Sequence, residues 1–226
     1  MSLSERVLVV TGGLGTLGRA VTSAAHQAGA TVVCVDFVDG APAPGIHSTP
    51  AVDLGDAEAA QAAFAAIAEQ FGKIDGVVNI AGGFAWETVG DGSIDTWDKM
   101  YQMNVRTAVN ATKSALPHIP ASGGRIVSIS AAGSVKADMG MGAYAASKSG
   151  VSKLTEALAE ELKSKNITVN AVMPSIIDTP VNRQDMPDAD FSTWVAPSAL
   201  ADVILFLLSD SADAVTGALI PVTGRV

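Results

Sequence analysis

The feature that most constrains the fold is an alternation of two kinds of segment along the chain. Short runs rich in Val and Ile lie at residues 6–10, 31–37, near 51–54, 74–82, 123–131, 167–174 and 217–224. Helix-like, often Ala-rich segments lie between most of them, at residues 17–30, 56–72, 93–119, 142–166 and 198–212. Strands that are apolar on both sides are typical of a parallel sheet covered by helices. The alternation therefore predicts an α/β fold, a doubly wound parallel sheet with helices on both faces.

Composition narrows the class of protein further. The chain has 226 residues, 48% of them hydrophobic and 16% charged, which predicts one compact domain over residues 1–226. Its formal net charge is −9, so binding to nucleic acid or to an anionic membrane surface is not expected. The chain has one cysteine, Cys34, so an internal disulfide is excluded. Its three histidines are scattered, so we expect no metal site. We see no signal peptide and no apolar run that could span a bilayer, so we expect a cytoplasmic protein.

The first strand runs directly into a glycine-rich patch, "TGGLGTLG", which then opens into a helix. Gly13, Gly15 and Gly18 form a Gly-x-Gly-x-x-Gly pattern at this junction. One glycine permits the tight turn, another lets the backbone approach a pyrophosphate, and the third lets helix and strand pack closely. Free amides at the helix start would then face the anion. A glycine-rich hairpin and a simple helix cap remain the alternatives.

Asp36 ends the second strand, 21 residues after Gly15. An acidic side chain at this place accepts hydrogen bonds from the adenine ribose and repels a 2′-phosphate. No Arg or Lys follows it in "DFVDGAPAPG". We therefore predict NAD(H) as the preferred cofactor and NADP(H) as the less favoured one. The alternative is that Asp36 is only a solvated strand end.

Tyr144 and Lys148 lie four residues apart on the predicted helix over 142–166, so they share one face. A phenol has a reference pKa of about 10, and a neighbouring ammonium lowers it. Tyr144 could then exchange a proton with a substrate oxygen. On spacing alone, an ordinary amphipathic helix with Tyr144 packed and Lys148 in water is the better explanation, because pairs at this spacing are abundant on helices.

Along nearly its whole length the chain resembles the short-chain dehydrogenase/reductase family, which implies a Rossmann-type fold and NAD(P)(H)-dependent hydride transfer. "TGGLGTLG", "VDL", "NIAG", "YAASK" and "MPSIIDTP" carry the resemblance, although Thr16 and Ser175 stand where the family has glycine. It implies Tyr144 and Lys148 as catalytic residues and Asn104 as holder of a proton-relay water. The implied cofactor contacts are Gly12, Gly13, Gly15, Thr16, Leu17, Gly18, Asp36, Asp53, Leu54, Asn79, Ala81, Gly82, Tyr144, Lys148, Pro174, Ile177 and Thr179. The resemblance also implies a homodimer or homotetramer, paired through the helices near 96–115 and 143–165.

One departure concerns the serine that the family places thirteen residues before the tyrosine, because this position holds Ala131. Ser130 precedes it, and one step along a strand reverses the side-chain direction, so we expect Ser130 to point away. Quinonoid dihydropteridine reductases, a branch of the same family, resemble this chain in the glycine turn, in that alanine and around residues 178–194. A conjugated pterin ring could accept hydride without the serine. The candidate pocket residues are Phe84, Trp86, Met139, Met141 and Trp194, each of which could instead be an ordinary core or loop residue.

Two classes of function follow from these observations. The first is an oxidoreductase that transfers hydride between NAD(H) and a small organic substrate. That substrate is either a quinonoid dihydropteridine or a generic ketone or alcohol, as in 3-oxoacyl-type reductases. The second is a non-catalytic module that senses nicotinamide nucleotides. In both, we expect residues 180–197 to form a lid over the pocket.

Overall fold

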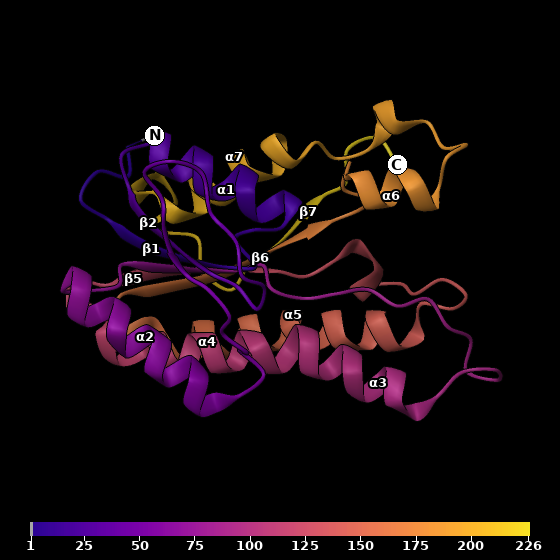
Figure 1. The fold of residues 1–226 in the computed structure, drawn as a ribbon, viewed down its shortest axis with the longest axis horizontal. Helices are drawn as coiled ribbons and strands as arrows, with labels where there is room; N and C mark the ends of the chain where they lie inside the picture. The colour runs from indigo at the N-terminus through magenta and orange to yellow at the C-terminus, as the bar shows by residue number, and fades with distance from the viewer. Residues whose placement is uncertain (1) are drawn as a thin grey trace.

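The computed structural model describes residues 2–226 and contains one seven-stranded parallel sheet. The strands are arranged in the order β3-β2-β1-β4-β5-β6-β7, as Figure 1 shows. Their bounds are β1 Val7–Thr11, β2 Thr31–Val35, β3 His47–Thr49, β4 Gly76–Asn79, β5 Gly124–Ile129, β6 Ile167–Pro174 and β7 Leu219–Val222. The predicted doubly wound parallel sheet is therefore confirmed.

Helices cover both faces of this sheet (Figure 1). On one face lie α1, Thr16–Gln27, and α7, Pro197–Leu208, which pack against each other. On the other lie α2, Ala57–Phe71, α4, Thr107–Ala115, and α5, Gly142–Leu162. Helix α3, Ile94–Tyr101, runs into α4 through a π-helical turn at Gln102–Arg106, and α6 spans Pro180–Asp185. None of the helices within residues 2–226 combines the length and hydropathy that crossing a bilayer requires.

The core lies on both sides of the sheet, as the strand composition predicts. All residues of β1, β4, β5 and β6 are buried. Val10 and Val127 pack toward α1 and α7, whereas Val9 and Val77 pack toward α2 and α4. Cys34 is fully buried within the first of these clusters, as expected for a small hydrophobe. These four strands therefore lack an exposed face, which is why their sequences show no polar alternation.

The third strand is where the sequence prediction is wrong. We expected it near residues 51–54, but β3 is His47–Thr49, paired with β2. Pro50 has no amide hydrogen, and Ala51 adopts a φ of 59°, so the chain leaves the sheet here. The amide of Val52 then donates to the carbonyl of Asp36, 2.9 Å away. This contact places the loop over 52–55 beside the carboxyl end of β2.

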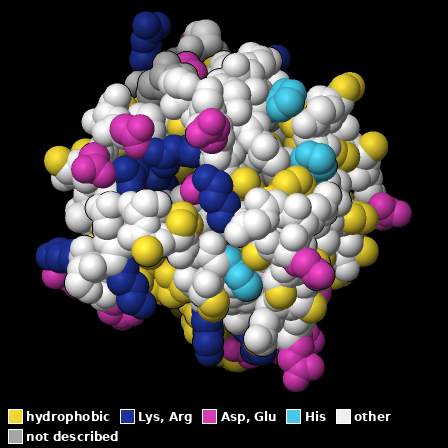
Figure 2. Space-filling model, turned by 90° about the vertical axis from the view of Figure 1, so that its left-hand side faces the viewer, with side chains coloured by type: hydrophobic (Ala, Val, Ile, Leu, Met, Phe, Trp, Pro, Cys, Tyr) yellow, Lys and Arg dark blue, Asp and Glu magenta, His cyan; other side chains and the backbone are white. Residues whose placement is uncertain are grey.

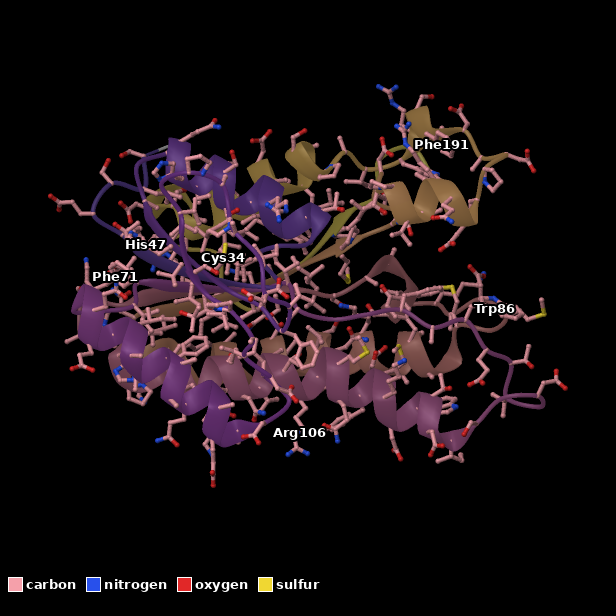
Figure 3. All side chains as sticks on the ribbon, viewed as in Figure 1. Cys34, His47, Phe71, Trp86, Arg106 and Phe191 are labelled. Atoms are coloured by element: carbon pink, nitrogen blue, oxygen red, sulfur yellow. The ribbon has the colours of Figure 1, made fainter. Side chains whose placement is uncertain are left out.

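Strand order reverses between β1 and β4, because the chain builds outward to β3 before it returns to the centre. In such sheets the crevice at the carboxyl ends of the two central strands is the usual ligand site. Figure 3 shows Trp86 and Phe191 at this end of the molecule, with His47 and Phe71 at the opposite end.

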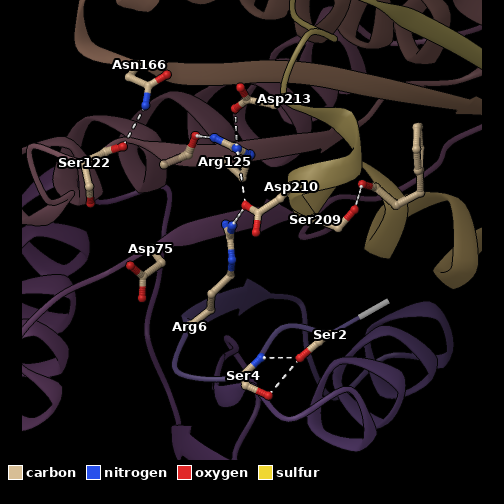
Figure 4. A network of polar contacts seen from close by, with 12 residues as sticks. Ser2, Ser4, Arg6, Asp75, Ser122, Arg125, Asn166, Ser209, Asp210 and Asp213 are labelled. Atoms are coloured by element: carbon tan, nitrogen blue, oxygen red, sulfur yellow. Dashed lines mark hydrogen bonds and ion pairs between the residues drawn. The ribbon is translucent and has the colours of Figure 1, made fainter.

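At the amino ends of the strands, an ionic network fastens the C-terminal region to the sheet (Figure 4). The buried Arg125 donates to Asp213 at 2.7 Å and lies 3.8 Å from Asp210, which also pairs with Arg6. The carboxylate of Asp75 accepts from the Val7 amide at 2.7 Å. Figure 2 views this end and shows acidic, basic and histidine side chains mixed over its surface. The network is a structural clamp on the side away from the crevice.

Candidate functional site

The site starts at the turn between β1 and α1, where three glycines have different roles. Gly12 has a φ of 64°, and a Cβ there would lie 2.9 Å from the amide nitrogen of Ala81. A Cβ at Gly18 would lie 2.1 Å from the carbonyl oxygen of Gly12, so α1 packs directly on the turn. Gly15 has free space beside it, because a Cβ there would meet its nearest atom, the carbonyl oxygen of Gly12, at 3.4 Å. The turn thus leaves one bare stretch of backbone facing outward, as the spacing predicts.

The first turn of α1 provides free hydrogen-bond donors beside that backbone. Within residues 2–226, the amides of Thr16, Leu17 and Gly18 donate to no protein acceptor. They lie at the positive end of the helix dipole, and no acidic side chain occupies the first turn. A diphosphate fits this cradle, because its oxygens would receive the amides that the protein leaves unpaired. Thr16 is exposed at the start of the helix and lines the cavity described next.

A cavity of about 670 Å³ runs along the carboxyl ends of the strands from this cradle. Asp36 stands in its wall and accepts hydrogen bonds from the amides of Leu14, at 2.9 Å, and Val38, at 3.3 Å. Asp53 is exposed in the wall and accepts from the Gly55 amide at 2.8 Å. Of the remaining predicted cofactor contacts, the cavity wall includes Gly12, Gly15, Thr16, Leu17, Gly18, Leu54, Ala81, Gly82 and Thr179.

Six predicted contacts lie outside the cavity wall, and two of them, Tyr144 and Lys148, are described in the next paragraph. The other four lie behind the wall. Gly13 packs on Cys34, where a Cβ would be 2.7 Å from Sγ. The buried amide of Asn79 donates to Thr112 and Ser128, so it braces β4 against its neighbours. Pro174 is buried at the end of β6, and Ile177 bridges to Val195. These residues hold the walls in place.

Lys148 and Asn104 come together beside Gly82, and the Tyr144 ring lies next to Lys148. A Cβ at Gly82 would lie 2.4 Å from Oδ1 of Asn104 and 3.6 Å from Nζ of Lys148. Nζ of Lys148 lies 6.0 Å from the centre of the Tyr144 ring. The Tyr144 hydroxyl forms no hydrogen bond within residues 2–226. The predicted catalytic residues are therefore neighbours, and the phenol hydroxyl is free to meet a substrate oxygen.

Asn104 lies in the π-helical turn that joins α3 to α4. Its Oδ1 accepts from the Gly83 amide at 2.9 Å, and its Nδ2 donates to the Gly83 carbonyl and to Ser147. Ser147 in turn donates to the Tyr144 carbonyl at 2.7 Å. The side chain of Asn104 thus ties the loop after β4 to the start of α5. Because these bonds occupy the side chain, a relay water would bind the backbone of Asn104 instead. π-Helical turns of this kind occur frequently at functional sites.

Two residues of this assembly escaped the sequence analysis. The hydroxyl of Thr11 accepts from the amides of Ile80 and Ala81, at 3.0 and 3.1 Å, and so fixes the loop after β4 beside the glycine turn. Thr11 was visible as the first residue of "TGGLGTLG". Ser147 had no such signal, because its partner Asn104 lies 43 residues away in sequence.

Comparison with known proteins agrees with this geometry. A short chain dehydrogenase family model matches residues 6–190. The chain is 30% identical to a 3-oxoacyl-[acyl-carrier-protein] reductase of Thermotoga maritima, over 99% of this chain and 98% of the relative. It is also 30% identical to a meso-2,3-butanediol dehydrogenase of Serratia marcescens, over 99% and 95%. A crystal structure of carveol dehydrogenase from Mycobacterium avium in complex with NAD superimposes with a TM-score of 0.89 at 27% identity, covering 98% of this chain and 97% of that one.

The chain belongs to the short-chain dehydrogenase family. It is an oxidoreductase, and its cofactor is a nicotinamide dinucleotide, NAD(P)(H). Its substrate is a small molecule. Within residues 2–226, no group of three or more His, Cys, Asp and Glu side chains is placed to hold a metal ion.

This short-chain dehydrogenase has no free hydroxyl at the serine position of its family. Ala131 occupies it and is buried. Ser130 donates to the Lys148 carbonyl at 2.9 Å and shares a hydrogen bond with Ser152 at 2.8 Å. Its hydroxyl is therefore committed to α5, in agreement with the direction expected from strand geometry. Neither residue offers a hydroxyl to a substrate carbonyl.

Protonation of the tyrosine–lysine pair differs from the sequence expectation. Burial raises the pKa of Tyr144 to about 12 and lowers that of Lys148 to about 8. The Lys148 ammonium instead donates to the Ile129 carbonyl at 2.8 Å. The expected lowering of the phenol pKa is therefore outweighed by loss of water around the ring. In this short-chain dehydrogenase the raised pKa favours the protonated form of Tyr144 at neutral pH.

The five candidate pocket residues have separate positions. Phe84 meets the Tyr144 ring edge-on, with centroids 4.9 Å apart. Trp86 is exposed and covers Gly140, and Met139 is exposed beside it. Met141 is half-buried against Gly133. Trp194 is buried next to Phe191, with centroids 4.8 Å apart, so it supports the segment over 180–197 rather than an open pocket.

Proposed function

We propose that this short-chain dehydrogenase reduces a small ketone, or oxidises the matching alcohol, with NAD(H) preferred over NADP(H). One observation carries the proposal. The Lys148 ammonium lies beside Gly82 and next to the ring of Tyr144, whose hydroxyl is free, and Gly82 lines the same cavity as the cradle that fits a diphosphate. A glycine hairpin or an ordinary amphipathic helix would not require this convergence.

The proposed cofactor contacts follow from the cavity wall. The amides of Thr16, Leu17 and Gly18 would hold the diphosphate, and Asp36 and Asp53 would meet the adenosine end. Asp36 supports the preference for NAD(H), because its carboxylate stands where a 2′-phosphate would have to approach. Thr179 and Gly82 would meet the nicotinamide end of the cavity. When bound, the nicotinamide supplies or accepts the hydride.

The protein's part in the reaction is proton transfer and positioning. Tyr144 donates its proton to the oxygen of the reduced carbonyl, which its raised pKa permits at neutral pH. Lys148, held by the Ile129 carbonyl, places positive charge beside the phenolate that remains. Asn104 and Ser147 position the tyrosine through its backbone. Residues 180–197, anchored by Trp194, would cover the bound substrate.

A quinonoid dihydropterin is the second candidate substrate, and Ala131 favours it. Without a serine hydroxyl, an isolated ketone receives polarisation from Tyr144 alone, whereas a conjugated, electron-poor ring accepts hydride more readily. Phe84 adds an aromatic surface next to Tyr144. The preference between this substrate and a generic ketone is decided by direct comparison of turnover.

The test is consumption of NADH, and separately of NADPH, with quinonoid dihydropterin and a panel of ketones. We expect turnover with NADH and a loss of at least about a hundredfold in Tyr144→Phe, because general acid catalysis contributes on that order. The variant should bind NADH as the parent does, measured by calorimetry. Unchanged turnover in Tyr144→Phe would refute the proton-donor role. NADH binding without turnover of any substrate would favour the nucleotide-sensing alternative.

We also propose that two copies of the chain pair through the face formed by α3, α5 and the π-helical turn. Trp97 and Tyr101 are 39% and 55% exposed there. They border a hollow of about 250 Å³ whose floor includes Ala143, Ala146 and Gly150. Aromatic side chains over small residues are suited to a helix–helix interface. Light scattering after gel filtration should give a dimer or tetramer, and Ala146→Arg should shift it toward monomer.

A further inference from the structure

The open end of the candidate site carries a cluster of exposed apolar side chains. They come from the loop after β4, the loop before α5 and the start of α6. They are Phe84, Trp86, Val89, Val135, Met139 and Val181, each more than half exposed. Exposed apolar groups scattered singly need no explanation, but a cluster at the rim of a site indicates contact with a ligand.

Contacts join two of the segments that carry these side chains, and the third segment lines the cavity of the site. The Glu87 amide donates to the Gly140 carbonyl at 2.8 Å, and the Trp86 ring covers Gly140. This joins the loop after β4 to the loop before α5. Phe84 reaches inward to Tyr144, and its side chain is still 58% exposed. Val181 lines the same cavity as Gly82. A substrate oxygen at Tyr144 therefore places the rest of the substrate against apolar surface.

The three segments that carry these apolar side chains have an excess of negative charge. The segments 84–91, 135–141 and 178–190 carry seven carboxylates: Glu87, Asp91, Asp138, Asp178, Asp185, Asp188 and Asp190. They carry two cations, Lys136 and Arg183. The backbone amide of Arg225 donates a hydrogen bond to the Thr193 carbonyl at 2.9 Å, so this residue lies just beyond the third segment. Arg183 donates to Asp178 at 2.6 and 2.8 Å and lies over the Phe191 ring, so this pair compensates itself and leaves six carboxylates and Lys136 in these segments. Lys148 is buried, and its ammonium donates to the Ile129 carbonyl.

We propose that this rim selects uncharged, apolar ring ketones and alcohols and discriminates against substrates that carry an anionic group. The proposal rests on the proposed function, because it places the reacting carbonyl at Tyr144. A flat ring would lie on Phe84, as aromatic and aliphatic ring faces pack well on exposed aromatic side chains. A carboxylate or phosphate on that ring would approach loops that carry an excess of negative charge, which disfavours its binding.

A matched pair of ketones tests the proposal: 4-methylcyclohexanone and 4-oxocyclohexanecarboxylate, which differ in one charged group. Each is assayed for kcat/KM with NADH, and for binding to the enzyme–NADH complex by fluorescence of the bound nicotinamide. We expect kcat/KM to be about tenfold or more higher for the neutral ketone. The difference should narrow in about 1 M salt, where the Debye length is about 3 Å.

Two variants separate charge from shape. Asp138→Lys should raise kcat/KM for the carboxylate severalfold and leave the neutral ketone within about twofold. Asp202→Lys is the matched control, because it makes the same charge change at an exposed position on α7 and should alter neither. Trp86→Ala should lower kcat/KM for both ketones by a similar factor, because both rings lose the same contact surface. The ratio between the two values of kcat/KM should therefore change little.

Equal or better use of the carboxylate, with no response to Asp138→Lys, overturns the inference. If NADH binds and neither ketone is consumed, the proposed function is refuted for these substrates. The binding measurement still decides the charge preference in that case, because it requires no turnover.

Discussion

The Lys148 ammonium donates to the carbonyl of Ile129, 2.8 Å away, and lies 6.0 Å from the centre of the Tyr144 ring. One hydrogen bond thus holds a buried cation against the end of β5, beside the residue that would exchange the proton. The burial that makes this arrangement useful for chemistry is unfavourable for folding, since a charged amine leaves water with few partners.

Replacing Lys148 with Met should therefore stabilise the protein near neutral pH, by about 1–3 kcal/mol. In the folded chain Lys148 loses its proton near pH 8, whereas in the unfolded chain it does so near 10.5. Between these values the unfolded state binds more protons, so the parent gains stability as pH rises. The advantage of Lys148→Met should be largest below pH 8 and shrink toward 10.5 in chemical denaturation. An advantage that does not change with pH would contradict this reading of the buried ammonium.

Asp36→Asn should shift the cofactor preference toward NADPH. The substitution keeps the size of the side chain and an oxygen for the Leu14 amide, but removes the negative charge from the cavity wall. We expect the ratio of NADPH to NADH affinity to rise by roughly tenfold, equivalent to about 1.4 kcal/mol. Titration of each cofactor into the purified variant measures it. An unchanged ratio would mean that Asp36 faces away from the ribose.

Gly18→Ala and Gly15→Ala should separate folding from cofactor binding. A Cβ at Gly18 would lie 2.1 Å from the Gly12 carbonyl oxygen, so this variant should lose roughly 2–4 kcal/mol of stability. At Gly15 the nearest atom would be 3.4 Å away and φ is −71°, so the fold should tolerate alanine. The new methyl would instead face the cradle and weaken NADH binding. Thermal melts and calorimetry on both variants check the contrast, which fails if Gly15→Ala binds NADH normally.

Ala131→Ser should raise kcat/KM for isolated ketones, by roughly tenfold, because it returns a hydroxyl donor toward the substrate carbonyl. A conjugated pterin should gain less. Ser130→Ala is the comparison variant, since that hydroxyl is bound to the Lys148 carbonyl and Ser152. A fall in kcat/KM for ketones in Ala131→Ser would contradict this prediction and would show that the substrate site does not accommodate a hydroxyl at this position.

Local sequence patterns were sufficient for the features that depend on neighbouring residues. The glycine spacing between Gly12 and Gly18 predicted the turn, because backbone freedom and close packing are properties of each position. Asp36 follows its strand directly, and Tyr144 and Lys148 share a helix face at four-residue spacing. Strands without polar alternation predicted a sheet buried on both sides. Each of these inferences needs only the geometry of one element and its junction.

Tertiary structure decided the properties that depend on packing between distant segments. Pro50 and Ala51 moved the third strand back to 47–49, because pairing with β2 ends there. Burial raised the pKa of Tyr144 despite the nearby lysine, which no spacing could reveal. Phe84 reached Tyr144 whereas Trp194 turned into the protein, although both are aromatic residues of loop-like segments. Solvent exclusion and side-chain direction result from the whole fold, and a local pattern does not contain them.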